Sequence, residues 1–226
     1  MIREGREEPR SEHHMEPDYK TQVEAYGDGL VPARPSELQR MEVYAQEHGF
    51  PIVGPASGQL CYLIARMIGA RRVFELGSGY GYSTAWFARA VQENGGGVVH
   101  HVVWDENLTR MAQEHLSVLG FDGLIQYHTG EAVGILRQTE GPFDLIFNDI
   151  DKPGYPDSLP VIEAKLRPGG VLIIDNMIWH ERVWDAAYND AATSGVREFT
   201  HRITTSPHWI TSLIPIRDGL IVAYKV

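Results

Sequence analysis

The chain has 226 residues, 43% of them hydrophobic, and a formal net charge of −10. This length suits one ordinary domain with a substantial core, and no apolar run approaches the ~20 residues that a membrane span requires. The acidic balance argues against a nucleic-acid partner, which needs clustered Lys and Arg, and the single cysteine, Cys61, fits a reducing cytoplasm.

The first segment, residues 1–20, is charged and poor in branched apolar residues, so we expect a flexible arm there rather than a signal peptide. Residues 21–226 are then expected to form a single domain. The pattern predicts a helix over residues 36–48, with Ser36 as its N-cap and Gly49 at its end.

A second helix is predicted over residues 58–68, after a break at 54–57. Its larger apolar residues recur at helical spacing, which predicts that they form the face towards the core. These residues are Leu60, Leu63, Ile64 and Met67.

From residue 72 onwards, short apolar runs alternate with helical patterns. The predicted strands lie at 73–76, 98–104, 124–128, 143–147 and 171–174, with helices at 83–92, 107–119, 132–138 and 158–165 between them. A further pair, 209–214 and 220–224, flanks a turn and reads as a hairpin. Such alternation predicts an α/β fold: a doubly wound, mostly parallel seven-stranded sheet, with helices on both faces and the antiparallel hairpin at one edge.

Polar residues follow two of the apolar strands. Asp149 and Lys152 come after the 143–147 strand, and Asp175 and Asn176 come after the 171–174 strand. The carboxyl ends of neighbouring strands meet at the crevice where open α/β sheets bind ligands, so these side chains are expected to converge as a divalent-metal site beside a lysine. The alternative is structural, because Asp and Asn also cap helices and form turns.

A glycine-rich turn, Gly77-Ser78-Gly79-Tyr80-Gly81, follows the first strand and precedes a helix. Glycines there let the backbone approach a ligand. The spacing departs from the Gly-x-Gly-x-x-Gly of dinucleotide sites, because Tyr82 occupies the third position. Glu75, just before the glycines, would repel a pyrophosphate but suits a ligand with a cationic amino group, such as S-adenosylmethionine.

Taken together, these motifs resemble the cation-dependent class I O-methyltransferases, the group of catechol and caffeoyl-coenzyme A O-methyltransferases. The resemblance runs from about residue 52 to the C-terminus. It rests on Gly-Gln at 58–59, the segments 74–83 and 143–152, Leu-Arg-Pro-Gly-Gly at 166–170, Asp-Asn at 175–176 and Asp-Gly-Leu at 218–220.

The resemblance implies a Rossmann-like fold, S-adenosylmethionine as cofactor, a divalent cation (most often Mg²⁺), a small phenolic acceptor and a homodimer. By position it makes Asp149, Asp175 and Asn176 the metal ligands and Lys152 the catalytic lysine, with Asp149 also at the reaction centre. The cofactor positions that it implies are Val53, Glu75, Gly77, Gly79, Ser83 and Asp149.

Two further cofactor positions depart from the family pattern. The ribose-binding acid of the family aligns with Val103, so we expect Asp105 to reach the ribose from a shifted strand end. Glu131 replaces the usual Asp or Ser near the adenine amino group and is long enough to accept the same hydrogen bond.

The expected reaction transfers a methyl group to one hydroxyl of a vicinal diphenol. Free phenols have a pKa of ~10, so a metal that stabilises the oxyanion and a lysine that takes the proton would both assist. Three alternatives stay open at this point: methylation of nitrogen or carbon on the same fold, a non-catalytic cofactor-binding module, and a nicotinamide dehydrogenase. The choice of acceptor is expected to depend on residues 178–195 and on the N-terminal arm.

Overall fold

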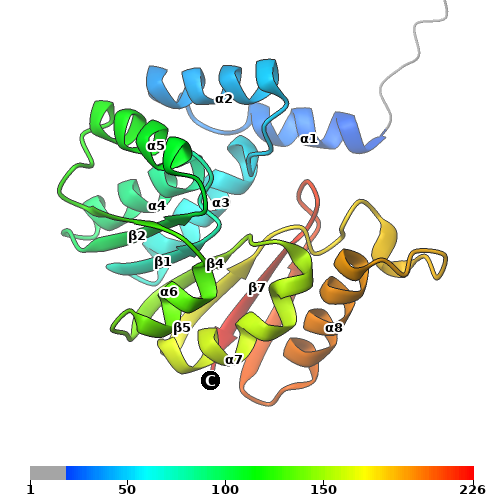
Figure 1. Cartoon of the computed structure of the whole chain (residues 1–226). Coiled ribbons are helices and arrows are strands. Elements are labelled where there is room, and N and C mark those ends of the chain that lie inside the picture. The colour runs from blue at the N-terminus through cyan, green and yellow to red at the C-terminus, as the bar shows by residue number, and fades with distance from the viewer. Residues whose placement is uncertain (1–18) are drawn as a thin grey trace, which may run out of the picture.

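The computed structural model describes residues 19–226, which form a seven-stranded sheet covered by helices on both faces (Figure 1). The strand order is β3-β2-β1-β4-β5-β7-β6. Only β7 runs antiparallel to its neighbours β5 and β6, and all other pairings are parallel. The predicted fold class, including the C-terminal hairpin at one edge, is therefore confirmed.

The strands are β1 (Arg72–Leu76), β2 (Val98–Val103), β3 (Ile125–Thr129), β4 (Phe143–Asn148), β5 (Leu166–Ile174), β6 (Trp209–Ile214) and β7 (Leu220–Lys225). The α-helices are α1 (Tyr19–Gly29), α2 (Ser36–His48), α3 (Gly54–Met67), α4 (Tyr82–Glu93), α5 (Glu106–Val118), α6 (Ala132–Gln138), α7 (Tyr155–Lys165) and α8 (Ala191–Thr205). Two short 3₁₀ helices are η1 (Lys152–Gly154) and η2 (Arg182–Trp184).

The sheet has an apolar layer on each side. Along β1, Val73 packs with α3, α4 and α5 on one face, whereas Phe74 and Leu76 pack with α6, α7 and α8 on the other. This alternation follows from the two-residue repeat of a strand. Apolar side chains fill both faces of the sheet. The pockets that could bind a ligand therefore lie at the carboxyl ends of the parallel strands, where the candidate site is found.

The predicted core face of α3 is only half right: Leu60 and Ile64 are partly buried and pack against the core, but Leu63 and Met67 do not. Leu63 and Met67 are 48% and 76% exposed, whereas the buried residues of this helix are small ones. The buried set is Gly54, Ser57, Gly58, Cys61 and Ala65. Close packing explains the difference, since a Cβ at Gly58 would lie 2.3 Å from the Trp86 indole nitrogen. The helix also begins at Gly54, so residues 54–57 form its first turn rather than a break.

Two further differences concern the N-terminal region and helix α8. Tyr19 and Lys20, expected within the flexible arm, begin helix α1, and the rest of the predicted arm lies outside the described residues. Ser36 is the first residue of α2 and Pro35 occupies its N-cap, while Gly49 ends the helix in the left-handed conformation as predicted. Helix α8 was not predicted.

Within residues 19–226, no helix combines the length and apolarity needed to cross a membrane.

Candidate active site at the carboxyl ends of β1, β4 and β5

Asp149 and Asp175 lie side by side, each one residue beyond the end of its strand. The backbone N–H of Asp149 donates to the Leu76 carbonyl at 2.8 Å, and that of Asp175 donates to the Asn148 carbonyl at 3.1 Å. Asn176 follows in the left-handed region, with φ of 57°. Sheet pairing therefore brings both acids and the amide to one pocket, as the sequence predicted.

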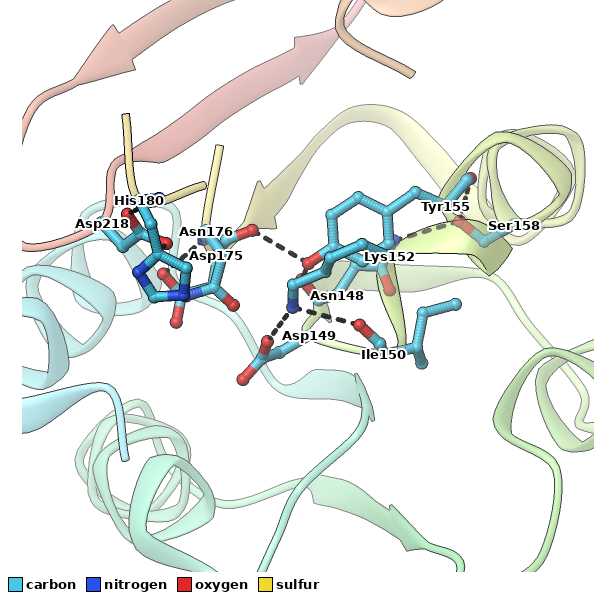
Figure 2. Close-up of polar contacts among 10 residues, drawn as sticks. All are labelled: Asn148, Asp149, Ile150, Lys152, Tyr155, Ser158, Asp175, Asn176, His180 and Asp218. Carbon is cyan, nitrogen blue, oxygen red and sulfur yellow. Dashed lines mark hydrogen bonds and ion pairs between the residues drawn. The ribbon is translucent and has the colours of Figure 1, made fainter. Parts of the chain in front are cut away.

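Lys152 occupies the same pocket. Its Nζ donates to Asp149 Oδ1 at 2.7 Å and to the Ile150 carbonyl at 3.1 Å (Figure 2). The side chain is only 7% exposed, and the amine lies 4.9 Å from the Tyr155 ring and 5.6 Å from the Trp179 ring. The carboxylate and the two rings together fix the position of this buried amine.

The cost of burying the Asp149 and Asp175 carboxylates is only partly offset by their neighbours. Desolvation raises the pKa of Asp149 although its side chain is 28% exposed, and the charge and hydrogen bond of Lys152 offset only part of that rise. Desolvation, together with the neighbouring charge of Asp149, also raises the pKa of Asp175. Two acids that disfavour their charged forms attract a cation, because a cation would stabilise both at once.

The donor set fits a small, hard cation. Among the described residues, no three His, Cys, Asp or Glu side chains are grouped to hold a metal ion. The set here consists of two carboxylates and one amide, from Asp149, Asp175 and Asn176, and all of them line one pocket. Oxygen donors of this kind are those that Mg²⁺ takes in proteins, with water completing its coordination.

Asp218 and Tyr155 are site residues to which the sequence assigned no role. Asp218 Oδ1 accepts the His180 N–H at 2.7 Å, its buried Oδ2 lacks a hydrogen-bond partner among the described residues, and its charge helps to raise the pKa of Asp175. The Tyr155 hydroxyl donates to the Asp175 carbonyl at 2.9 Å. Asp218 is part of the Asp-Gly-Leu motif at 218–220, which marked its position but not its role.

The glycine turn forms the wall of an adjoining pocket. Gly77 has φ of 87°, and a Cβ there would lie 2.3 Å from the Asp149 carbonyl oxygen, so the ends of β1 and β4 touch only because this residue is glycine. The same pocket is lined by Val53, Gly79 and Ser83, three of the predicted cofactor positions. Asp149 belongs to this pocket and to the pocket of Asp175, so it joins the two.

Glu75 lies fully buried at the end of β1. Neither of its carboxyl oxygens has a hydrogen-bond partner among the described residues. Desolvation raises its pKa to about 7, although the nearby hydroxyls of Ser83 and Thr84 offset part of the rise. A buried carboxylate that is only weakly compensated by nearby hydroxyls is costly, and a cationic group would reduce that cost. The ammonium of S-adenosylmethionine is such a group, so this turn fits that cofactor.

Asp105 and Glu131 cap helices. Asp105 Oδ1 accepts the Asn107 N–H at 2.7 Å at the start of α5, and Glu131 accepts two backbone N–H groups at the start of α6. Both residues are exposed at the ends of β2 and β3. Their assignment to the cofactor therefore stays a prediction, and Val103 at the end of β2 is almost fully buried.

A protein-family profile described as O-methyltransferase matches residues 35–226 of this chain. A catechol O-methyltransferase from Niastella koreensis is 35% identical over 188 residues, which cover 78% of this chain and 84% of that protein.

Solved structures agree with this match. The O-methyltransferase TomG from Streptomyces achromogenes, involved in tomaymycin synthesis and solved with SAM, superposes with a TM-score of 0.83 at 28% identity, covering 93% of this chain and 100% of TomG. An O-methyltransferase from Bacillus cereus solved with SAH gives a TM-score of 0.82 at 28% identity, over 91% and 97% of the two chains.

Proposed function

The chain belongs to the O-methyltransferase family and is an S-adenosylmethionine-dependent O-methyltransferase, and we propose that its acceptor is an aromatic vicinal diol. We further propose that the reaction requires a divalent cation, Mg²⁺ in the first instance, held by Asp149, Asp175 and Asn176. The catechol O-methyltransferase relative supports the acceptor class.

One observation gives the main support for the proposed metal site and for the diol acceptor. Two incompletely compensated carboxylates, Asp149 and Asp175, face one pocket beside a buried lysine, and Asp149 also lines the glycine pocket. A cation bound between these two acids would stabilise the charged forms of both. A vicinal diol is the acceptor that uses the arrangement, because its two oxygens can chelate one cation.

Different residues are proposed to bind the cofactor and the cation. Glu75 would bind the cofactor ammonium, and Val53 would cover the cofactor from the loop before α3. When bound, the cofactor supplies a methyl group already activated on sulfur, and the cation supplies Lewis-acid stabilisation of the acceptor oxyanion. Asp149, Asp175 and Asn176 would hold that cation so that the acceptor oxygen faces the methyl group in a near-attack geometry.

Lys152 is the proposed proton acceptor. Its Nζ lies 2.7 Å from Asp149 Oδ1, so it faces the acceptor side of the pocket, and it is shielded from solvent by Tyr155 and Trp179. In the proposed reaction Lys152 takes the proton of the attacking hydroxyl or pairs with the phenolate that remains.

The test is methyl transfer from S-adenosylmethionine to catechol, measured with Mg²⁺, with excess chelator, and after Mg²⁺ is restored. We expect turnover with Mg²⁺, loss with chelator and recovery on restoration. Phenol, which has only one hydroxyl, serves as the matched acceptor control and is expected to be a poor substrate. Full turnover of catechol in excess chelator would refute the role of the metal.

A further inference from the structure

A second cavity, of about 450 Å³, lies between helix α1 and the turn that joins β6 to β7. We call it the α1 cavity. Its walls are mostly apolar and include Tyr26 from α1, Trp184 from η2 and Ile216 from the turn. Tyr26 and Trp184 are 71% and 65% exposed. None of the residues proposed to hold the cofactor, the metal or the proton lines this cavity.

A hollow lined by His180, Glu181 and Trp184 lies between the acceptor side of the active site and the α1 cavity. His180 lines the pocket that holds Asp149 and Asp175, and it also lines a shallower hollow together with Glu181 and Trp184. Glu181 and Trp184 in turn line the α1 cavity. Four residues of chain span at most about 14 Å, so the path from His180 to Trp184 is short enough for one acceptor molecule.

The segment between the two regions has an unusual backbone. Asn176, Trp179, His180 and Glu181 all have positive φ, between 47° and 65°. Residues other than glycine adopt this region at a cost, and such costs are retained mostly at binding and catalytic sites. Asp218 holds the segment through the bond from the His180 N–H to its Oδ1. The strained segment thus turns the chain from the proposed metal ligands towards the α1 cavity.

The charges around the α1 cavity limit what it can bind. Glu24, Asp28 and Glu181 line it against Lys20 and Arg217, so acidic residues outnumber basic ones. Lys20 is also engaged, because its Nζ lies 3.7 Å from Glu181 Oε1. Together with the net charge of −10 for the whole chain, this lining would repel a ligand that carries several phosphate groups. An uncharged apolar group is the ligand that suits these walls.

We infer that the α1 cavity receives an uncharged apolar arm of the methyl acceptor while the diol of that acceptor lies at Asp149 and Asp175. The inference rests on the proposed function. It assigns the acceptor to aryl- or alkyl-substituted vicinal diols rather than to phosphorylated thioesters such as those of coenzyme A. Trp184 is then a specificity-determining residue.

The experiment compares catechol with a series of 4-(ω-phenylalkyl)catechols of increasing arm length. We expect kcat/KM to rise by about tenfold or more, mainly through KM, once the phenyl group reaches the cavity. In Trp184→Ala the ratio of kcat/KM for the long-armed acceptor to that for catechol should fall about tenfold. Met67→Ala, on the exposed face of α3, is the matched control and should leave that ratio unchanged.

A second measurement keeps this inference separable from the proposed function. Biphenyl-4-ol has the apolar arm but no diol, and its binding to the full-length protein can be measured by calorimetry without any turnover. We expect binding that weakens in Trp184→Ala, even if catechol proves not to be a substrate. The inference is overturned if arm length does not affect kcat/KM, if a caffeoyl-coenzyme A acceptor is preferred, or if a second copy of the chain covers the cavity and biphenyl-4-ol does not bind.

Discussion

Strand β4 carries an aspartate near each end, and the two have opposite surroundings. At the amino end, Asp144 accepts the backbone N–H groups of Arg71 and Arg72 at 2.9 Å each and the Arg167 Nε at 2.7 Å. Burial alone would raise the pKa of Asp144, but the Arg167 bond and the two backbone bonds hold it below its ordinary value. The hydrogen bonds of Asp144 therefore all serve to stabilise the fold.

At the carboxyl end, Asp149 has Lys152 as its only hydrogen-bonding side-chain partner among the described residues, and its pKa is raised. Burial also raises the pKa values of Glu75 and Asp175, at the carboxyl ends of the neighbouring strands β1 and β5. A buried carboxylate that accepts all its hydrogen bonds from the protein stabilises the fold. A buried carboxylate that accepts few of them is available to bind a ligand. We therefore propose that Asp144 is a structural carboxylate and Asp149 a functional one, and the following substitutions test both halves of this proposal.

The largest effect is expected for Asp149→Asn. The substitution keeps the shape of the side chain but removes the charge proposed to hold the cation, so turnover of a diol should fall by about 10³-fold or more. The fold should tolerate it, because the amide oxygen can still accept the hydrogen bond from Lys152. Steady-state kinetics and a melting curve on the same preparation check both parts. Near-normal turnover with intact folding would place Asp149 outside the chemistry.

Lys152→Met is expected to have the next largest effect. Loss of the proposed proton acceptor should lower kcat by about 10²-fold at neutral pH. The loss should shrink as the pH rises towards ~10, where the phenol ionises without help. The pH profile of kcat for the variant and the parent gives the answer. A loss that is constant with pH would mean that Lys152 only shapes the pocket.

A smaller effect is expected on cofactor binding through Glu75. Its pKa of about 7 means that the carboxyl takes up a proton as the pH falls from 8 to 6 and loses its attraction for an ammonium group. Affinity for S-adenosylmethionine should therefore weaken by roughly tenfold over that range. Calorimetric Kd values at several pH values measure this. Glu75→Gln is the control and should bind weakly at every pH, with a much flatter profile.

Asp144→Asn should have the smallest effect on turnover and a clear one on stability. Losing the charged acceptor of three hydrogen bonds should cost about 2 kcal/mol and lower the melting temperature by roughly 4–8 °C. Because the folded-state pKa of Asp144 is depressed, this stabilisation is fully present above the unfolded pKa of ~3.9 and is lost as the pH falls further, through the lower folded-state pKa. The difference from the parent should therefore vanish in acid. A loss of kcat in folded Asp144→Asn would contradict the comparison.

Much of the fold and the placement of the site could be predicted from the sequence. Alternating strands and helices fix a parallel sheet, and a parallel sheet puts every strand's carboxyl end at one edge. Asp149, Lys152, Asp175 and Asn176 were therefore placed together correctly without any knowledge of distances. What each residue does there stays a proposal.

Other features depend on contacts that periodicity does not reveal. The fully buried residues of α3 are small, because α4 presents the large Trp86 to this helix. Counting large apolar residues therefore missed them and included the exposed Leu63 and Met67. Helix α8 is rich in Thr, a weak helix former, although its Asp190 cap and the spacing of Val196, Phe199 and Ile203 were readable signals. The incomplete bonding of Glu75 appears only in three dimensions.

The central claim is that the incompletely bonded acids at the carboxyl ends hold a divalent cation. Its most direct test is a crystal structure with Mn²⁺, which substitutes for Mg²⁺ and is located by its anomalous signal. The account predicts one ion bonded to oxygens of Asp149, Asp175 and Asn176, at the roughly 2.0–2.2 Å typical of such bonds. An ion bound elsewhere, or Asp149 still engaged only by Lys152 at saturating Mn²⁺, would contradict it.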